Sequence, residues 1–131
     1  MLRRINLEIH ALAPTLIRLR STGVYHSPDA PEQGRPLAES RLIRSVEMTQ
    51  HRLVRSLAAA RFLIGEFEDP ENRPYLMIVN KDLARSFRFH ILLKQDGRKL
   101  RRISPHSGRE EVFEGEMDWL APGAGILFRV E

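Results

Sequence analysis

The sequence contains no cysteine, and this absence removes several kinds of chemistry at once. Without cysteine the chain has no disulfide bonds, no thiolate nucleophile and none of the sulfur ligands that most structural zinc sites use. It also has no apolar run of about 18 residues, the length that crosses a bilayer, so we expect no membrane partner. No apolar signal segment follows the two arginines near the start, and the cellular location stays open.

Lysine and aromatic residues are scarce as well. Lys81, Lys94 and Lys99 are the only lysines among 21 basic residues, and aromatic residues make up 7% of the chain. The net charge of +4 is unevenly spread, because residues 1–61 carry ten basic and five acidic side chains. A nucleic-acid-binding surface usually combines clustered basic residues with stacking aromatics. The arginines of residues 41–61 lack such aromatics, so nucleic acid is not the partner we expect.

Side chains able to take part in catalysis are present but not grouped. Glu66, Glu68 and Asp69 form one acidic cluster, whereas glycoside hydrolysis needs two carboxyl groups about 5–10 Å apart across the bond. Neighbouring acids on a strand point to opposite faces, so we interpret these three as solvated acids at strand ends. The five histidines show no metal-ligand spacing, and no Gly-x-Ser-x-Gly elbow occurs. We therefore predict no catalytic residue, no metal site and no cofactor.

An amphipathic helix is predicted within residues 1–23. Its apolar residues recur at three- and four-residue steps and form one stripe. Pro14 removes a backbone donor and is expected to kink the helix, which continues to Arg20 and stops at residues 21–23. We expect the stripe to form a domain or oligomer interface, either on the rest of the chain or between copies. Its residues are Leu2, Ile5, Ile9, Leu12 and Leu16.

Residues 24–40 are predicted to form a loop, and residues 41–131 an antiparallel β-sandwich. The loop is rich in proline and glycine and has no apolar periodicity. Beyond it, turn signals recur about every 8–12 residues, a spacing typical of a sandwich or barrel. We expect a mainly β fold with Greek-key-like connections and one N-terminal α-helix.

Three segments within residues 41–131 give clear signals, and one does not. Five consecutive apolar residues at 75–79 are typical of a strand buried on both faces, which we place at the centre of the sandwich. Residues 87–93 alternate apolar and polar side chains, as a half-buried strand does. Asp96 and Gly97 then form the strongest hairpin signal of the chain. Residues 52–60 fit a helix or a strand.

Two aromatic side chains are candidates for stacking on sugar rings. Tyr25 lies in the predicted loop and is the least constrained, and Trp119 precedes the turn into the last strand. Tyr75 begins a buried strand and is better explained as part of the core. A carbohydrate-binding module usually displays several such rings in a row, so we keep carbohydrate as an alternative ligand.

Three stretches share a recognisable pattern. Residues 5–16 read Ile-Asn-Leu-Glu-Ile-His-Ala-Leu-Ala-Pro-Thr-Leu, and residues 19–26 read Leu-Arg-Ser-Thr-Gly-Val-Tyr-His. Residues 62–128 include Val-Asn-Lys-Asp after an apolar strand and Pro-Gly before Gly-Ile-Leu-Phe. Together they resemble the C-terminal region of glycoside hydrolases with a (β/α)-barrel catalytic domain. In that resemblance the first stretch is similar to the helix that leaves the barrel, the second to the linker, and the third to the closing sandwich.

The resemblance implies a sandwich that packs on the barrel and stabilises it, with the catalytic acids upstream of this chain. The expected function is therefore a non-catalytic C-terminal accessory domain of a glycoside hydrolase, with no enzyme activity of its own. Its expected partner is the catalytic barrel, or a second copy bound through the N-terminal helix. A carbohydrate-binding module is the alternative, and a small basic nucleic-acid-binding or protein-interaction domain is a further one.

Overall fold

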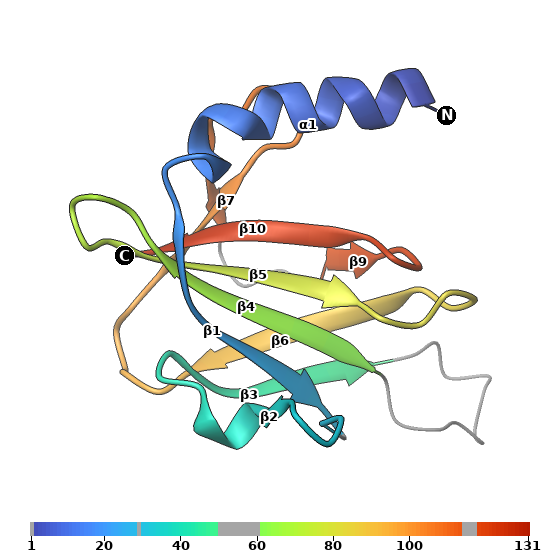
Figure 1. The fold of residues 1–131 in the computed structure, drawn as a ribbon, viewed down its shortest axis with the longest axis vertical. Coiled ribbons are helices and arrows are strands. Elements are labelled where there is room, and N and C mark those ends of the chain that lie inside the picture. The colour runs from blue at the N-terminus through green and yellow to red at the C-terminus, as the bar shows by residue number, and fades with distance from the viewer. Residues whose placement is uncertain (1, 29, 50–60, 114–117) are drawn as a thin grey trace.

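The computed structural model describes residues 2–28, 30–49, 61–113 and 118–131. In these ranges the chain forms two packed sheets and one long helix, which confirms the mainly β sandwich with an N-terminal helix (Figure 1). No helix in the described ranges has the length and apolar character needed to cross a bilayer. The elements are α1 (Leu2–Leu16), β1 (Arg20–Ser27), β2 (Arg35–Pro36), the 3-10 helix η1 (Leu37–Glu39), β3 (Ile43–Thr49), β4 (Phe62–Glu68), β5 (Pro74–Asn80), β6 (Phe87–Leu93), β7 (Leu100–Ile103), β8 (Glu110–Phe113), β9 (Asp118–Leu120) and β10 (Gly125–Val130).

The larger sheet has seven strands in the order β2-β1-β4-β5-β10-β7-β8, and the smaller has three in the order β3-β6-β9. All the pairings are antiparallel except the short contact of β2 with β1. The middle strand of the larger sheet is β5, which buries Leu76 and Ile78 between the sheets and Tyr75 on the opposite face. The apolar run at 75–79 is thus the central, doubly covered strand, as predicted.

The main core lies between the two sheets and follows the period of two that strands impose. On β6, Phe87, Phe89 and Ile91 are buried, while Arg88 between them is exposed. The ring of Phe89 faces Phe128 of β10 across the sandwich, with centroids 6.3 Å apart in an edge-to-face arrangement. The alternation expected over residues 87–93 is therefore confirmed, and it supplies one side of the core.

The N-terminal segment differs from the prediction. Helix α1 ends at Leu16 rather than at Arg20. Just after the helix end, the Leu19 amide donates a hydrogen bond of 3.1 Å to the Leu16 carbonyl oxygen. The chain then enters β1, which pairs with β4 from Arg20 to Ser27. The predicted loop at 24–40 is therefore wrong in part, since residues 24–27 belong to a strand and 35–39 to β2 and η1. Pairing with β4 stabilises this strand, although the local sequence has no strand periodicity.

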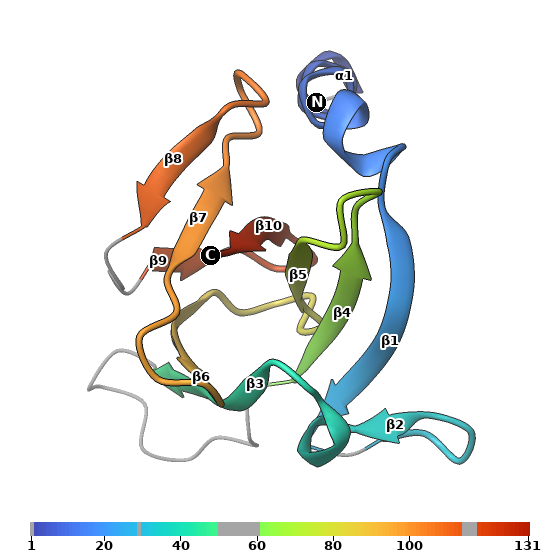
Figure 2. The same cartoon turned by 90° about the vertical axis from the view of Figure 1, so that its left-hand side faces the viewer.

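Register and topology add two features that the sequence pattern does not predict. Strand β3 has a register shift between Ile43 and Ser45, where one extra residue is accommodated in the pairing with β6. Asp96 and Gly97 do form a turn, with φ of 83° at Gly97, but it joins β6 of the small sheet to β7 of the large one. The predicted hairpin at this point is therefore an inter-sheet connection (Figure 2). Residues 52–60 lie outside the described ranges.

Candidate functional site

Helix α1 rests on the outer face of the larger sheet through its C-terminal half. Leu12 and Leu16, followed by Leu19 after the helix end, pack against a small second core. The buried members of that core are Tyr75 of β5, Ile103 of β7 and Leu127 of β10. Two of the five residues predicted for the interface stripe, Leu12 and Leu16, thus dock on the sandwich itself.

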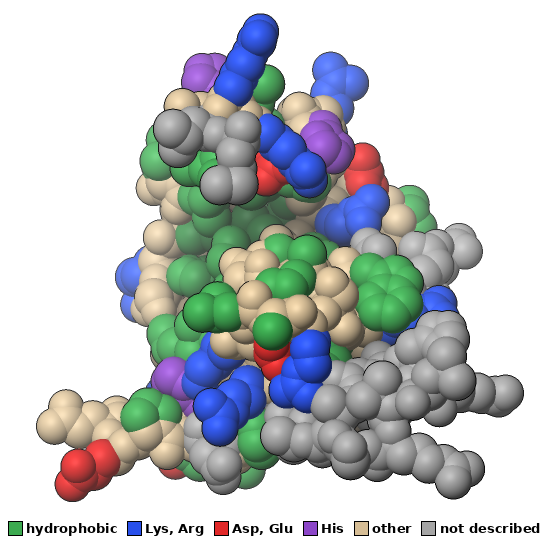
Figure 3. Space-filling view, turned by 90° about the vertical axis from the view of Figure 1, so that its right-hand side faces the viewer, with side chains coloured by type: hydrophobic (Ala, Val, Ile, Leu, Met, Phe, Trp, Pro, Cys, Tyr) green, Lys and Arg blue, Asp and Glu red, His purple; other side chains and the backbone are tan. Residues whose placement is uncertain are grey.

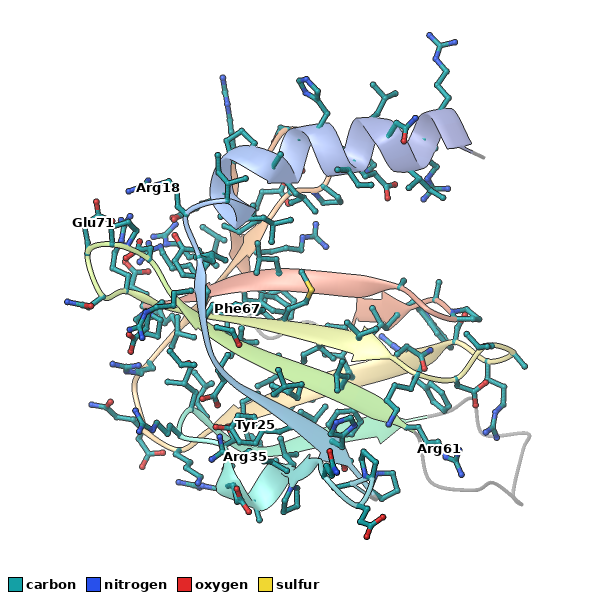
Figure 4. All side chains as sticks on the ribbon, viewed as in Figure 1. Arg18, Tyr25, Arg35, Arg61, Phe67 and Glu71 are labelled. Atoms are coloured by element: carbon teal, nitrogen blue, oxygen red, sulfur yellow. The ribbon has the colours of Figure 1, made fainter. Side chains whose placement is uncertain are left out.

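Two contacts fix the helix in place on either side of this core. Just past the helix end, Arg18 Nη2 donates to the two carboxylate oxygens of Glu71 at 2.9 and 3.1 Å. The two side chains meet at the β4–β5 turn (Figure 4). On the flank, Gly108 lies against the main-chain carbonyl of Ala11, where a Cβ would not fit. The helix is therefore held at its end and along one side, as well as from beneath.

The N-terminal half of α1 continues the same stripe beyond the contact. Ile5 is 43% exposed and Ile9 is 58% exposed, although both share the helix face of Leu12 and Leu16. The side chain of Leu2, the fifth predicted member, lies outside the described part of the structure. Figure 3 shows a hollow beneath the helix in which hydrophobic side chains gather. The stripe thus has a docked half and an open half.

Polar side chains cover one flank of the open half. Arg3 and Arg4 are exposed there, and Arg4 Nε lies 3.0 Å from Glu8 Oε1. On the flank away from the stripe, a shallow groove of about 720 Å³ separates the helix from the turn after β7. His10 and His106 line this groove from opposite sides. This flank of the helix is therefore predominantly basic.

Tyr25 is not an exposed ring, and the prediction that it stacks on sugars is wrong for this structure. It is 1% exposed within the core between the sheets. The guanidinium of Arg35 on β2 covers its ring at 4.8 Å, and the close approach of Gly23 leaves room for its hydroxyl (Figure 4). Burial, and after it the charge of Glu66, raises the pKa of this hydroxyl above its ordinary value. Its position on β1, a strand that the sequence pattern did not indicate, explains the difference.

Trp119 is the sugar-stacking candidate that remains at the surface. It lies on β9, an edge strand of the small sheet, and is 51% exposed. The guanidinium of Arg88 on the neighbouring strand β6 lies 5.9 Å from the ring centre, as the register Arg88–Trp119 places it. An exposed indole beside a guanidinium is a surface on which an apolar sugar face can stack.

Two of the acids interpreted as solvated are buried. Glu66 is 1% exposed, and one of its oxygens accepts bonds from the Ser40 hydroxyl and from the Leu42 amide, the latter at 3.3 Å. Asp69 accepts bonds from the Glu71 and Arg73 amides at 3.0 and 2.9 Å, and from Arg73 Nε at 2.6 Å. Through its bonds to Ser40 and Leu42, Glu66 connects β4 to the segment just before β3. Asp69 stabilises the β4–β5 turn through its bonds to Glu71 and Arg73. Both acids have structural partners, so their burial has a structural cause.

A second hollow opens at the edge of the sandwich between the two sheets. Its volume is about 1020 Å³, and it lies where the β6–β7 turn passes beside β8. Apolar side chains of β6, β7 and β8 form its floor, and arginine and lysine residues surround it. No local sequence pattern indicates this hollow, because four separate segments meet there only in the fold: Arg44, residues within 90–101, residues 112–113 and Glu131.

The titratable side chains do not converge in the described ranges. No group of three histidines or acids is placed to hold a metal ion there. Among the histidines, His26 lies 3.2 Å from Lys81 Nζ, His90 lines the inter-sheet hollow, and His51 falls outside the described ranges. The candidate surfaces in the described part thus include the open half of α1, the groove beside it, the Trp119 edge and the inter-sheet hollow.

No protein-family model matches this sequence, and no curated protein or solved structure is similar to it at a significant level.

Proposed function

We propose that this chain is a non-catalytic accessory domain of a glycoside hydrolase and that it packs on the (β/α)-barrel through the open half of α1. The observation that carries the proposal is the exposure of Ile5 and Ile9 on a stripe whose other half is already an interface. A continuous apolar stripe with an exposed half is typical of a protein–protein contact surface. The sequence resemblance supplies the identity of the partner.

The charge around the stripe defines the partner surface further. Arg3 and Arg4 lie on the groove side of the same half of α1, and within the described ranges Arg4 pairs with Glu8. A partner that covers the stripe and also reaches this flank therefore combines an apolar centre with acidic residues on one side of its rim. We expect such a patch on the outer helices of the barrel.

The proposal is tested by producing the polypeptide encoded directly before Met1 and mixing it with this chain. Sedimentation velocity is expected to show a one-to-one complex. The double variant Ile5→Ser and Ile9→Ser is expected to weaken the complex by about 10-fold or more, since each buried isoleucine contributes roughly 1.5–3 kcal/mol.

Ile17→Ser is the matched control, because Ile17 is 82% exposed and lies past the helix end, away from the stripe. We expect this variant to bind as the wild type does. Equal weakening by the control, or no complex with an upstream polypeptide that folds as a barrel, would contradict the proposal. Hydrolysis of aryl glycosides by this chain alone would contradict its non-catalytic part.

Carbohydrate binding is a second candidate because Trp119 is half exposed at a sheet edge beside Arg88. It predicts that the chain is retained on an insoluble polysaccharide and that Trp119→Ala abolishes the retention. Tyr25→Ala is not informative here, since that ring is buried. Absence of retention across neutral and acidic polysaccharides would remove this candidate.

A further inference from the structure

The hollow between the sheets has an apolar floor that packs against the core. Ile91, Leu93, Leu100 and Phe113 line it from three different strands. Phe113 is fixed by an edge-to-face contact with Phe128, whose ring centre is 5.0 Å away, and by stacking near Phe89. Rings packed on both sides have little freedom to close the hollow, so its floor is preformed.

The rim of the hollow is basic. Arg44, Arg98, Lys99 and Arg101 line it with two acids, Asp96 and Glu131, so these side chains carry a formal net charge of +2, with His90 counted as neutral. Two of the four cations already have acidic partners. Arg44 Nη2 lies 3.7 Å from Asp96, and Arg101 Nε lies 2.8 Å from Glu131.

Arg98 and Lys99 are the other two cations, and they differ from most of the arginines in the described ranges. Among the described residues, no carboxylate lies within ion-pair distance of either side chain. Their backbone is nevertheless fixed, since Lys99 and Glu131 exchange main-chain bonds of 3.1 and 2.8 Å. The hollow thus presents two cations with no acidic partner in the described ranges, adjacent to an apolar floor.

We propose that this hollow binds a small organic anion, with its carboxylate, sulfate or phosphate group at Arg98 and Lys99 and its apolar part on the Phe113 floor. The volume of about 1020 Å³ is at the upper end of the size of small-molecule sites. Charge-assisted bonds from arginine and lysine recognise such groups strongly. The proposal does not depend on the accessory role of α1, because the hollow is formed by β6, β7 and β8.

The geometry favours a small ligand over nucleic acid. Single-stranded nucleic acid needs exposed rings on which successive bases stack. Among the described residues that line the hollow, Phe113 is the only Phe, Tyr or Trp, and its ring already contacts Phe89 and Phe128. The anionic group has two natural sources, an acidic saccharide and a free anionic metabolite, and different probes distinguish them.

The test is titration of the 15N-labelled full chain with digalacturonate, with neutral galactobiose and with phenyl phosphate. Saturable shifts of the Gly97 and Leu100 amides are expected with at least one of the two anions. Binding of digalacturonate alone identifies an acidic saccharide, and binding of phenyl phosphate alone identifies a non-sugar anion. The double variant Arg98→Gln and Lys99→Gln is expected to weaken binding by about 10-fold or more, because it removes two charge-assisted contacts.

The matched control is the double variant Lys81→Gln and Arg109→Gln, which makes the same change of charge outside the hollow. It is expected to bind the anion as the wild type does. Thermal unfolding of both double variants checks that the fold is retained, and Arg98→Glu is a further variant expected to abolish binding. The proposal is overturned if neither anion binds, if galactobiose binds as tightly as the anion, or if the control weakens binding equally.

Discussion

Gly108 packs directly against the main-chain carbonyl of Ala11, and this contact sets how closely the turn after β7 approaches α1. Gly108 has φ of 70°, and its amide donates to the Ser104 carbonyl oxygen at 2.8 Å, so the turn closes on itself. A side chain at this position would overlap the Ala11 carbonyl oxygen. The orientation of the helix therefore depends on a residue that has no side chain.

Gly108→Ala is expected to destabilise the protein more than Gly97→Ala. Both glycines have positive φ, 70° and 83°, so each alanine variant incurs strain of about 1–2 kcal/mol. Only at Gly108 does the added Cβ also meet backbone, whereas nothing lies within 4 Å at Gly97. Urea unfolding of the two variants measures the difference, and equal losses would show that the Ala11 contact does not constrain the helix.

Leu16→Ala is expected to lower the free energy of unfolding by about 1–3 kcal/mol, because it opens a cavity in the partly buried contact below α1. Ile9→Ala, at 58% exposure on the same stripe, is expected to change it by less than about 0.5 kcal/mol. Hydrogen exchange of the α1 amides should become faster in the first variant alone. Similar losses in both would mean that the two halves of the stripe are equally buried in solution.

Asn80 joins the two sheets, and its replacement is expected to uncouple them. Its buried amide donates to the carbonyl oxygens of Arg85 and Leu120 at 2.8 and 3.1 Å, and its oxygen accepts from the Asp82 amide at 2.9 Å. Asn80→Ala leaves these buried groups unpaired, at a cost of roughly 1–3 kcal/mol.

Asn80→Asp is the sharper test of this joint, since it keeps the shape but replaces the donor with a charged acceptor that faces carbonyl oxygens. We expect it to destabilise the protein more than Asn80→Ala at neutral pH, because a buried charge without a donor is more costly than a cavity. Chemical denaturation at pH 7 gives the comparison. If Asn80→Asp were as stable as the wild type, these bonds would not hold the sheets together.

Asp69 makes the stability of the β4–β5 turn depend on pH. Burial raises the pKa of its carboxyl, but the hydrogen bonds from the Arg73 amide and guanidinium outweigh burial and hold the pKa below its ordinary value. A lowered folded pKa gives stability that is fully present above the unfolded pKa, about 4, and is lost as the pH falls through the folded value. The wild type is therefore expected to lose stability over this acidic range.

Asp69→Asn is expected to lose about 1–3 kcal/mol at pH 7, because the amide cannot replace the carboxylate as an acceptor for all three bonds. Its stability should then fall less than that of the wild type between about pH 5 and pH 2. Glu32→Gln, at an exposed position, is the control and should follow the wild type. Parallel pH profiles for Asp69→Asn and the wild type would show that this carboxylate has no part in acid unfolding.

Several strands were predictable because the burial of their faces produces a recognisable pattern of apolar residues in the local sequence. Strand β5 is a continuous apolar run because both of its faces are covered, and β6 alternates because only one of its faces is covered. The turn at Asp96 and Gly97 was predictable for the same local reason, but its partners were not. A turn residue fixes the backbone conformation and does not specify which sheet the chain enters next.

The sites were less predictable, because they depend on pairing between distant segments. Tyr25 has the neighbours of a loop residue and becomes buried only when β1 pairs with β4. Glu66 looks like a surface acid until Ser40 and Leu42 supply its bonds. No residue within a few positions of either one carries that information.

The sequence by itself determined the class of fold and the amphipathic helix, because burial on a strand or helix face is repeated along the chain at a fixed period. Only the tertiary structure decided that the stripe is docked at Leu12 and Leu16 and open at Ile5 and Ile9. It alone brought Arg98 and Lys99 beside the Phe113 floor. Both outcomes depend on how elements that are distant in the sequence are positioned against one another. That arrangement follows from the packing of the whole chain.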